Sequence, residues 1–180
     1  MSETIYPDDP AGPYDPPPVV TTADDGTEIE IRAHDESERE REALVEMYRD
    51  FDAADRAQGI PPGGESRIRE WLDSILEPDC YNVIAWDGET AAGHATLVPD
   101  DGSYELAIFV NQPYQGIGIG TELIETLLGY GAQNGVERVW LSVERWNRAA
   151  IGLYKKVGFE TSDAESFELE MAARLTTADG

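Results

Sequence analysis

Three glycines, Gly116, Gly118 and Gly120, alternate with isoleucine immediately before an amphipathic helical pattern over residues 122–132. Glycine weakens the start of a helix, so its presence indicates that the backbone is needed there without side chains. A strand-like segment at 103–110 precedes the glycines, and another at 136–143 follows the helical pattern. A strand, a helix and a strand in this order predict a parallel pair inside a sheet that is otherwise largely antiparallel.

The remaining periodicities predict the other elements of one mixed α/β (α+β) domain. Strands are predicted at 27–33, 81–86, 90–98, 159–161 and 166–172, and helices at 37–56, 66–76 and 148–157. Asp87 and Gly88 mark a hairpin turn between two of the strands, and Asn147 fits the N-cap of the last helix. A stiff loop at 59–64 joins the first two helices. We therefore expect a sheet of six or seven strands flanked by about four helices.

The N-terminal residues differ in composition from the rest of the chain. Residues 1–26 contain six prolines, several aspartates and few large apolar side chains. Such a segment buries too little apolar surface to fold, so we expect a disordered, acidic, proline-rich leader. The folded domain is then expected over residues 27–180, a length that suits a single domain.

Acidic residues outnumber basic ones by 37 to 13, and the formal net charge is -24. Such a chain lacks the broad basic patch with which proteins bind nucleic acids or anionic membranes. The acids are dispersed, whereas an acidic interaction tail would form a local run. Because molar salt shortens the screening length to about 3 Å, we interpret the charge as adaptation to a salty, halophilic cytoplasm.

Cysteine and histidine are scarce. Cys80 is the one cysteine, which excludes an internal disulfide and a cysteine-built metal site and suggests a reducing cytosol. No apolar segment approaches the length of a membrane span, and the first residues lack the pattern of a secretory signal. His34 and His94 are isolated, without a second ligand at metal spacing, so we expect both to be structural or exposed and to bind no metal. The sequence predicts a cytoplasmic protein.

Two explanations fit glycines between a strand and a helix. Bare N–H groups at the positive end of the helix dipole form an anion site, for which phosphate is the usual ligand. Close packing of the helix against the strand also requires small residues. A Walker loop requires Gly-Lys-Ser/Thr, but Thr121 and Glu122 follow Gly120. A dinucleotide-binding turn is disfavoured as well, because Thr121 stands at its third glycine and five residues separate the strand from the glycines.

Two segments, in this order and at this spacing, resemble a known family. QGIGIG at 115–120 matches the Q/R-x-x-G-x-G/A signature of the Gcn5-related N-acetyltransferases, the GNAT superfamily. NRAAIGLYKKVGF at 147–159 is similar to that family's N-x-x-A-x-x-x-Y-x-x-x-G-F segment at every fixed position. The resemblance extends from about residue 27 to residue 175 and implies the GNAT fold, in which the central parallel strands splay apart.

The resemblance implies that acetyl-CoA is the co-substrate. Main-chain groups of Ile108, Phe109 and Val110 would bond the pantetheine arm like an added strand, because splayed strands leave backbone groups that need partners. Asn147 is implied both as a helix cap and as a hydrogen-bond partner of the coenzyme. The N–H groups implied in pyrophosphate binding are those of Gln115, Gly116, Ile117, Gly118, Ile119, Gly120 and Thr121. Because a carboxylate would repel the phosphate, we expect the Glu122 side chain to point away.

The resemblance also implies direct attack of a neutral amine on the thioester in a ternary complex. Tyr154 occupies the position of the family's general acid, although its helical spacing with Ile151 and Val157 also fits a core tyrosine. A lysine amine, with a pKa of about 10.4, must lose a proton before it attacks. Glu144, at the end of a strand, is the first candidate for the base, and Glu105, on the strand before the glycines, is the second.

We therefore expect an N-acetyltransferase that acts on a primary amine, as a monomer or a homodimer. The amine is a protein lysine, a protein N-terminus or a small molecule. Trp71 and the loop at 59–64 fall in the region that lines the acceptor site in the GNAT family, where sequences diverge. The alternatives are a non-catalytic acyl-CoA-binding sensor or scaffold and, less favoured, a nucleotide-binding protein.

Overall fold

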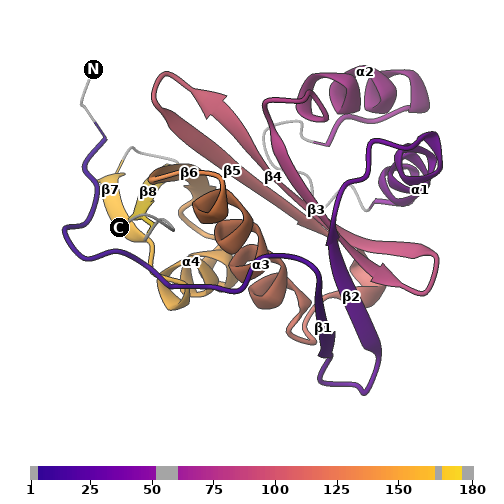
Figure 1. The fold of residues 1–180 in the computed structure, drawn as a ribbon, viewed down its shortest axis with the longest axis horizontal. Coiled ribbons are helices and arrows are strands. Elements are labelled where there is room, and N and C mark those ends of the chain that lie inside the picture. The colour runs from indigo at the N-terminus through magenta and orange to yellow at the C-terminus, as the bar shows by residue number, and fades with distance from the viewer. Residues whose placement is uncertain (1–3, 52–60, 165–167, 176–180) are drawn as a thin grey trace.

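The computed structural model describes residues 4–51, 61–164 and 168–175, and a single sheet runs through it (Figure 1). The strands are β1 (Val19–Thr22), β2 (Glu28–Ala33), β3 (Tyr81–Asp87), β4 (Thr90–Asp100), β5 (Ser103–Val110), β6 (Arg138–Glu144), β7 (Glu160–Ala164) and β8 (Glu168–Arg174). The helices are α1 (Glu38–Arg49), α2 (Glu65–Ile75), α3 (Ile119–Gln133) and α4 (Arg148–Lys156), with a 3-10 turn η2 (Gln112–Tyr114) before α3. The strands lie in the order β1-β2-β3-β4-β5-β6-β8-β7.

All neighbouring strands of the described sheet are antiparallel except β5 and β6. The parallel pairing is short: Tyr104 pairs with Val139 and Glu105 with Trp140, and the register ends there. On its other side, β5 pairs with β4 along its whole length. The predicted mixed α/β fold, with a splayed parallel pair in a mostly antiparallel sheet and four helices, is confirmed. The described sheet has eight strands rather than six or seven because β1 adds an edge.

The N-terminal segment lies along the domain instead of extending away from it, as the indigo trace in Figure 1 shows. β1 pairs with β2, Ala11 N–H donates to Arg174 O at 2.6 Å, and the Tyr14 hydroxyl donates to Val157 O at 2.8 Å. A Cβ on Gly129 would lie 2.6 Å from the Tyr14 carbonyl oxygen, so this close approach depends on glycine. Residues 4–26 therefore differ from the disordered leader expected over 1–26. Backbone pairing orders them although their composition offers little apolar surface.

The helices cover both faces of the sheet: α1 and α2 lie on one side, and α3 and α4 on the other (Figure 1). Leu123 and Leu127 of α3 are fully buried against the strands, as are Leu44 of α1 and Leu72 of α2 on the opposite face. Burial of each such side chain stabilises the fold by about 1.5–3 kcal/mol. Among the described helices, none combines the length and apolarity needed to cross a membrane.

Two helices begin at side-chain caps, of which the one at Asn147 was predicted. The Ser37 hydroxyl accepts from Glu40 N–H and begins α1, and the Asn147 side chain accepts from Ala150 N–H and begins α4. The first helix was predicted to residue 56, but α1 ends at Arg49. Residues 52–56 of that prediction lie outside the described residues, as do 59–60 of the predicted loop and 166–167 of the last predicted strand.

A buried chain of hydrogen bonds ties α1 to the sheet. Asn82 Nδ2 donates to Ile75 O at 2.9 Å, so the Asn82 Oδ1 accepts from His94 Nε2 at 2.7 Å. His94 Nδ1 then accepts from the Tyr48 hydroxyl at 2.6 Å. Complete burial, with a smaller effect of His34, lowers the pKa of His94 to about 3, so the ring is neutral. His94 therefore has the structural role expected of it.

Candidate active site

The edge of β5 that turns away from β6 presents main-chain groups. Asn111 N–H donates to Ala92 O of β4 at 2.9 Å. Because backbone groups alternate along a strand, those of Phe109 also face β4, whereas those of Ile108 and Val110 face the diverging side. The Gln115 side chain donates to Val110 O at 3.0 Å on that side. Of the three residues predicted to bond the pantetheine arm, Ile108 and Val110 thus have suitably directed groups and Phe109 does not.

Residues 115–121, which we call the glycine loop, end at the uncapped start of α3. The N-cap is Gly118, with φ +90° and no side-chain capping bond. The first N–H groups of a helix have no intrahelical acceptor, so those of Ile119, Gly120 and Thr121 are left without one. In the part of the chain that the structure describes, the N–H groups of Gly116 and Ile117 also find no acceptor. The Gln115 N–H, also predicted to bind the pyrophosphate, instead donates to Gln112 O at 3.1 Å. These donors and the helix dipole make the loop suited to an anion.

The three glycines serve different purposes. Gly116 and Gly118 have φ values of +76° and +90°, a region that other residues rarely adopt. Gly120 is helical, and a Cβ there would lie 3.4 Å from Leu153 of α4 and 3.9 Å from Val110. Backbone conformation therefore accounts for glycine at positions 116 and 118, and close packing accounts for it at position 120.

A pocket of about 210 Å³ opens against the first turn of α3. Its lining includes Lys156 from α4, Asp24 from the turn after β1, and Glu122. Asp24 N–H donates to Ile117 O at 2.9 Å, which fixes the turn against the glycine loop. The sequence motifs did not indicate Lys156, which stands at a variable position of the second motif, or Asp24, which falls in the segment expected to be disordered. Glu122 lies in this lining, although its side chain was expected to point away.

Tyr154 projects from α4 into the core, where its ring lies 5.9 Å from that of Phe159. Its side chain is nearly buried, and burial raises the pKa of the hydroxyl to about 12. No described residue forms a hydrogen bond with this hydroxyl, which is also not among the fully buried polar atoms that lack a partner. The oxygen therefore keeps some contact with solvent, which a reacting group requires and a purely structural tyrosine does not.

The two candidate bases lie on the face of the sheet opposite α3. Leu106 and Val143 are buried in the α3 side of the core, so Glu105 and Glu144, their neighbours, point to the other face. Partial burial and the nearby Asp100 carboxylate raise the pKa of Glu105. Glu105 stands where β5 and β6 still pair, whereas Glu144 lies at the end of β6, where its carbonyl accepts from Asn147 N–H at 3.0 Å.

Neither a metal site nor a nucleophilic thiol is indicated by the described residues. One group, His34, Asp35 and Glu40, has the composition and spacing of metal ligands. Its oxygens are engaged at the start of α1: Asp35 Oδ1 accepts from Ser37 N–H, and Glu40 Oε1 from Asp35 N–H. Burial, and Asp79 beside it, raise the pKa of Cys80 to about 11, so its thiol stays protonated.

Comparison with known proteins agrees with this geometry. A family model described as the acetyltransferase (GNAT) family matches residues 41–159. The chain is 33% identical over 95 residues to an uncharacterized N-acetyltransferase, YobR, of Bacillus subtilis. The matched region covers 52% of this chain and 38% of YobR. It also spans less than half the length of further curated relatives.

Two solved structures share the fold. The GNAT domain of S. lividans PAT has a TM-score of 0.72 at 16% identity, covering 88% of this chain and 97% of that domain. The PaiA N-acetyltransferase of Thermoplasma acidophilum, solved in complex with coenzyme A, has a TM-score of 0.63 at 24% identity, covering 81% of this chain and 98% of PaiA. At these identities the likeness shows the fold.

The backbone of the glycine loop can be tested with a matched pair of variants. Gly118→Ala places a Cβ at φ +90°, so we expect a loss of about 1–2 kcal/mol in unfolding free energy. Gly152→Ala in α4 meets no atom within 4 Å and should be stabilising by about 0.5–1 kcal/mol. Urea unfolding measures both. Equal effects of the two variants would contradict the left-handed conformation at Gly118.

Proposed function

The chain belongs to the acetyltransferase (GNAT) family, and we propose that it transfers an acetyl group from acetyl-CoA to a primary amine. The single observation that carries the proposal is the uncapped start of α3 beside the strand edge that turns away from β6. The start of α3 supplies N–H donors for a diphosphate, and the edge of β5 supplies main-chain partners for an amide-bearing arm. Acyl-CoA carries a diphosphate followed by such an arm.

In this proposal acetyl-CoA lies along β5 with its diphosphate at the glycine loop. The N–H groups of residues 116–121 bind the diphosphate, and Lys156 adds a cation beside them. The pantetheine arm pairs with the backbone of Ile108 and Val110, and Asn147 lies near it at the start of α4. The thioester then points toward the position where β5 and β6 meet. Asp24 and Glu122 oppose the diphosphate, and molar salt screens this repulsion.

Glu105 is our preferred base, ahead of Glu144, which reverses the order drawn from the sequence. The register pairs Glu105 with Trp140, so Glu144 lies four residues further along β6 and beyond the point of divergence. The raised pKa of Glu105 also makes it a stronger base than a glutamate of ordinary pKa. Only about one lysine amine in 10³ is neutral at pH 7, so proton removal matters to the rate.

The proposed reaction is a direct transfer. The ammonium gives one proton to Glu105, directly or through one water, and the neutral nitrogen then adds to the thioester carbonyl carbon. The carbon–sulfur bond breaks, coenzyme A leaves as a thiolate, and the nitrogen releases its second proton to solvent as the amide forms. The Tyr154 hydroxyl stabilises this thiolate by donating a hydrogen bond. Because the pKa of Tyr154, about 12, exceeds that of a thiol, about 8.5, solvent supplies the final proton.

The acceptor is proposed as a class, a primary amine on a protein lysine, a protein N-terminus or a small molecule. We also propose that the enzyme works in a salty cytoplasm, as a monomer or homodimer, without metal or nucleic acid. The dispersed negative charge supports that setting, because a protein with many acidic residues and few lysines remains soluble at high salt. The second candidate function is an acyl-CoA-binding module without turnover, which the same glycine loop would also serve.

Removal of the Tyr154 hydroxyl separates these two functions. Tyr154→Phe should lower kcat by about 10²-fold at unchanged acetyl-CoA affinity, because the hydroxyl acts on the departing thiolate and not on the bound coenzyme. Tyr130→Phe, which removes a half-buried hydroxyl from α3, is the control and should retain kcat. Thiol release across a panel of amines in molar KCl and calorimetry with acetyl-CoA give the two readouts. Binding without turnover in the unmodified protein would favour the binding module.

The choice of base is tested by Glu105→Gln against Glu144→Gln. We expect Glu105→Gln to reduce kcat by about 10²-fold and to remove an acidic limb of the pH profile that lies above the ordinary glutamate pKa. Glu144→Gln should keep both the limb and most of the rate. The reverse outcome, with the limb lost in Glu144→Gln, would restore Glu144 as the base.

A further inference from the structure

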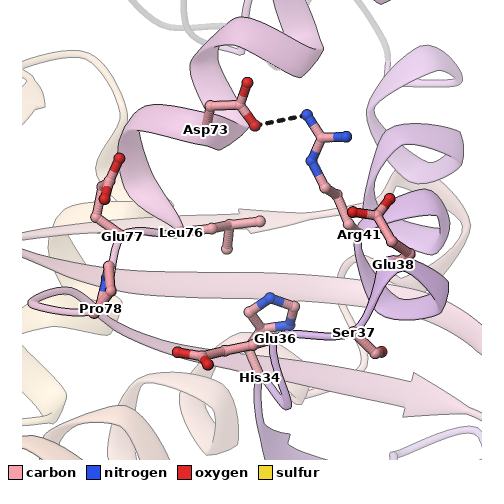
Figure 2. A pocket seen from close by; sticks show the side chains of 9 residues that line it. All are labelled: His34, Glu36, Ser37, Glu38, Arg41, Asp73, Leu76, Glu77 and Pro78. Carbon is pink, nitrogen blue, oxygen red and sulfur yellow. Dashed lines mark hydrogen bonds and ion pairs between the residues drawn. The ribbon is translucent and has the colours of Figure 1, made fainter.

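A second pocket, of about 510 Å³, lies between the start of α1 and the end of α2 (Figure 2). It opens where β2 ends and β3 begins. The glycine loop follows the end of β5. The last residue of β5, Val110, pairs with Gly93 of β4, and Gly93 pairs with Ala85 near the end of β3, so the loop lies level with the end of β3. The two pockets are therefore at opposite ends of the strands. The polar side chains that matter below are His34, Glu36, Glu38, Arg41, Asp73 and Glu77.

Carboxylates dominate this pocket. Arg41 is neutralised by Asp73 across the opening, at 2.6 Å, as the dashed line in Figure 2 shows. Glu36, Glu38 and Glu77 form no ion pair with any residue in the described ranges. Three uncompensated carboxylates around one hollow attract a cation.

His34 forms the floor of the pocket, and only 8% of its side chain is exposed. Its Nδ1 lies 2.9 Å from Glu40 Oε1. A carboxylate can only accept, so Nδ1 carries the proton and, in the neutral ring, Nε2 keeps its lone pair. Figure 2 shows a ring nitrogen turned toward the cavity, and Nε2 has no hydrogen-bond partner among the described residues. A solvent-accessible acceptor, on a side chain that is mostly buried and held in place by a carboxylate, is thus aimed into an acidic hollow.

Capping of α1 explains only part of this arrangement. Asp35 and Ser37 accept from the Ser37 and Glu40 N–H groups at the start of the helix, and the Glu40 carboxylate holds His34. That role leaves the cavity-facing nitrogen and the unpaired Glu77 on the opposite wall unexplained. A metal ion fits less well, because the oxygens that gather around His34 are those of Asp35 and Glu40, which already bond to backbone N–H groups.

We propose that this pocket binds a small organic cation that carries N–H donors, an alkylamine or a guanidine. An N–H of the ligand donates to His34 Nε2, and Glu36, Glu38 and Glu77 balance its charge. The need for an N–H donor excludes quaternary ammonium ions and alkali cations. Neither Glu105 nor any residue of the glycine loop lines this pocket, so the proposal does not rest on the acetyl-transfer proposal.

Agmatine, which carries one ammonium and one guanidinium group, is the probe. Calorimetry on the full chain without coenzyme, in about 1 M KCl, suppresses non-specific attraction to the acidic surface. We expect one agmatine per chain, affinity about tenfold lower in Glu38→Gln and in Glu77→Gln, and no heat from tetramethylammonium. Glu46→Gln, an exposed position further along α1, is the matched control and should bind normally. An unchanged circular dichroism spectrum and urea-unfolding midpoint of each variant show that it is folded.

Glu105→Gln distinguishes this pocket from the acceptor site and should also bind agmatine normally. The proposal is overturned if agmatine gives no heat, or if Glu38→Gln and Glu77→Gln bind it as well as the unmodified protein. Affinity lost in Glu105→Gln alone would assign the cation to the acceptor site. Binding of Zn²⁺ with no response to agmatine would replace the organic cation with a metal.

Discussion

The early divergence of β5 from β6 is the constraint on which the candidate site depends. The two strands pair at only two positions, and beyond Glu105 the edge of β5 has main-chain groups directed away from β4. Unpaired backbone groups are costly unless water or a ligand satisfies them. The strand leads directly into a loop whose N–H groups, and those of the first turn of α3, also lack acceptors. One local failure of sheet pairing thus places outward-facing main-chain groups of β5 a few residues before the N–H groups of the loop.

Main-chain recognition suits a chain of this composition. With a net charge of -24 and two lysines in all, the protein has few side chains with which to attract a phosphate. Backbone N–H groups and a helix dipole do not depend on side-chain charge, so an acidic surface leaves them unchanged. Lys156 is the lysine that lines the pocket at α3, and it is countered there by Asp24 and Glu122. The proposed diphosphate site therefore rests on geometry more than on net charge.

Local patterns in the sequence predicted most of the fold, since periodicity, hairpin turns and the Asn147 cap are properties of neighbouring residues. β1 was missed because composition describes how much apolar surface a segment buries, whereas backbone pairing with β2 needs none. The same omission hid Asp24 at the glycine loop. The motif located the loop but could not separate Gly116 and Gly118, which need positive φ, from Gly120, which packs against Leu153.

Tertiary surroundings decided the remaining questions. The sequence offered Glu144 and Glu105 as bases by their place on the strands alone, and the strand register and the raised pKa of Glu105 favour Glu105. Likewise, an isolated histidine in sequence gives no sign that Glu40 holds His34 at the floor of a pocket. Tyr154 fits both a helical core position and an acid, and only the solvent contact of its hydroxyl favours the second.

The most direct measurement is the backbone amide NMR spectrum of the protein during titration with coenzyme A in molar KCl. Donation to the diphosphate should move the amide proton resonances of residues 116–121 strongly downfield, while those of remote glycines such as Gly102 stay in place. Saturable coenzyme binding that leaves the amides of Gly116, Gly118 and Gly120 unshifted would contradict the account.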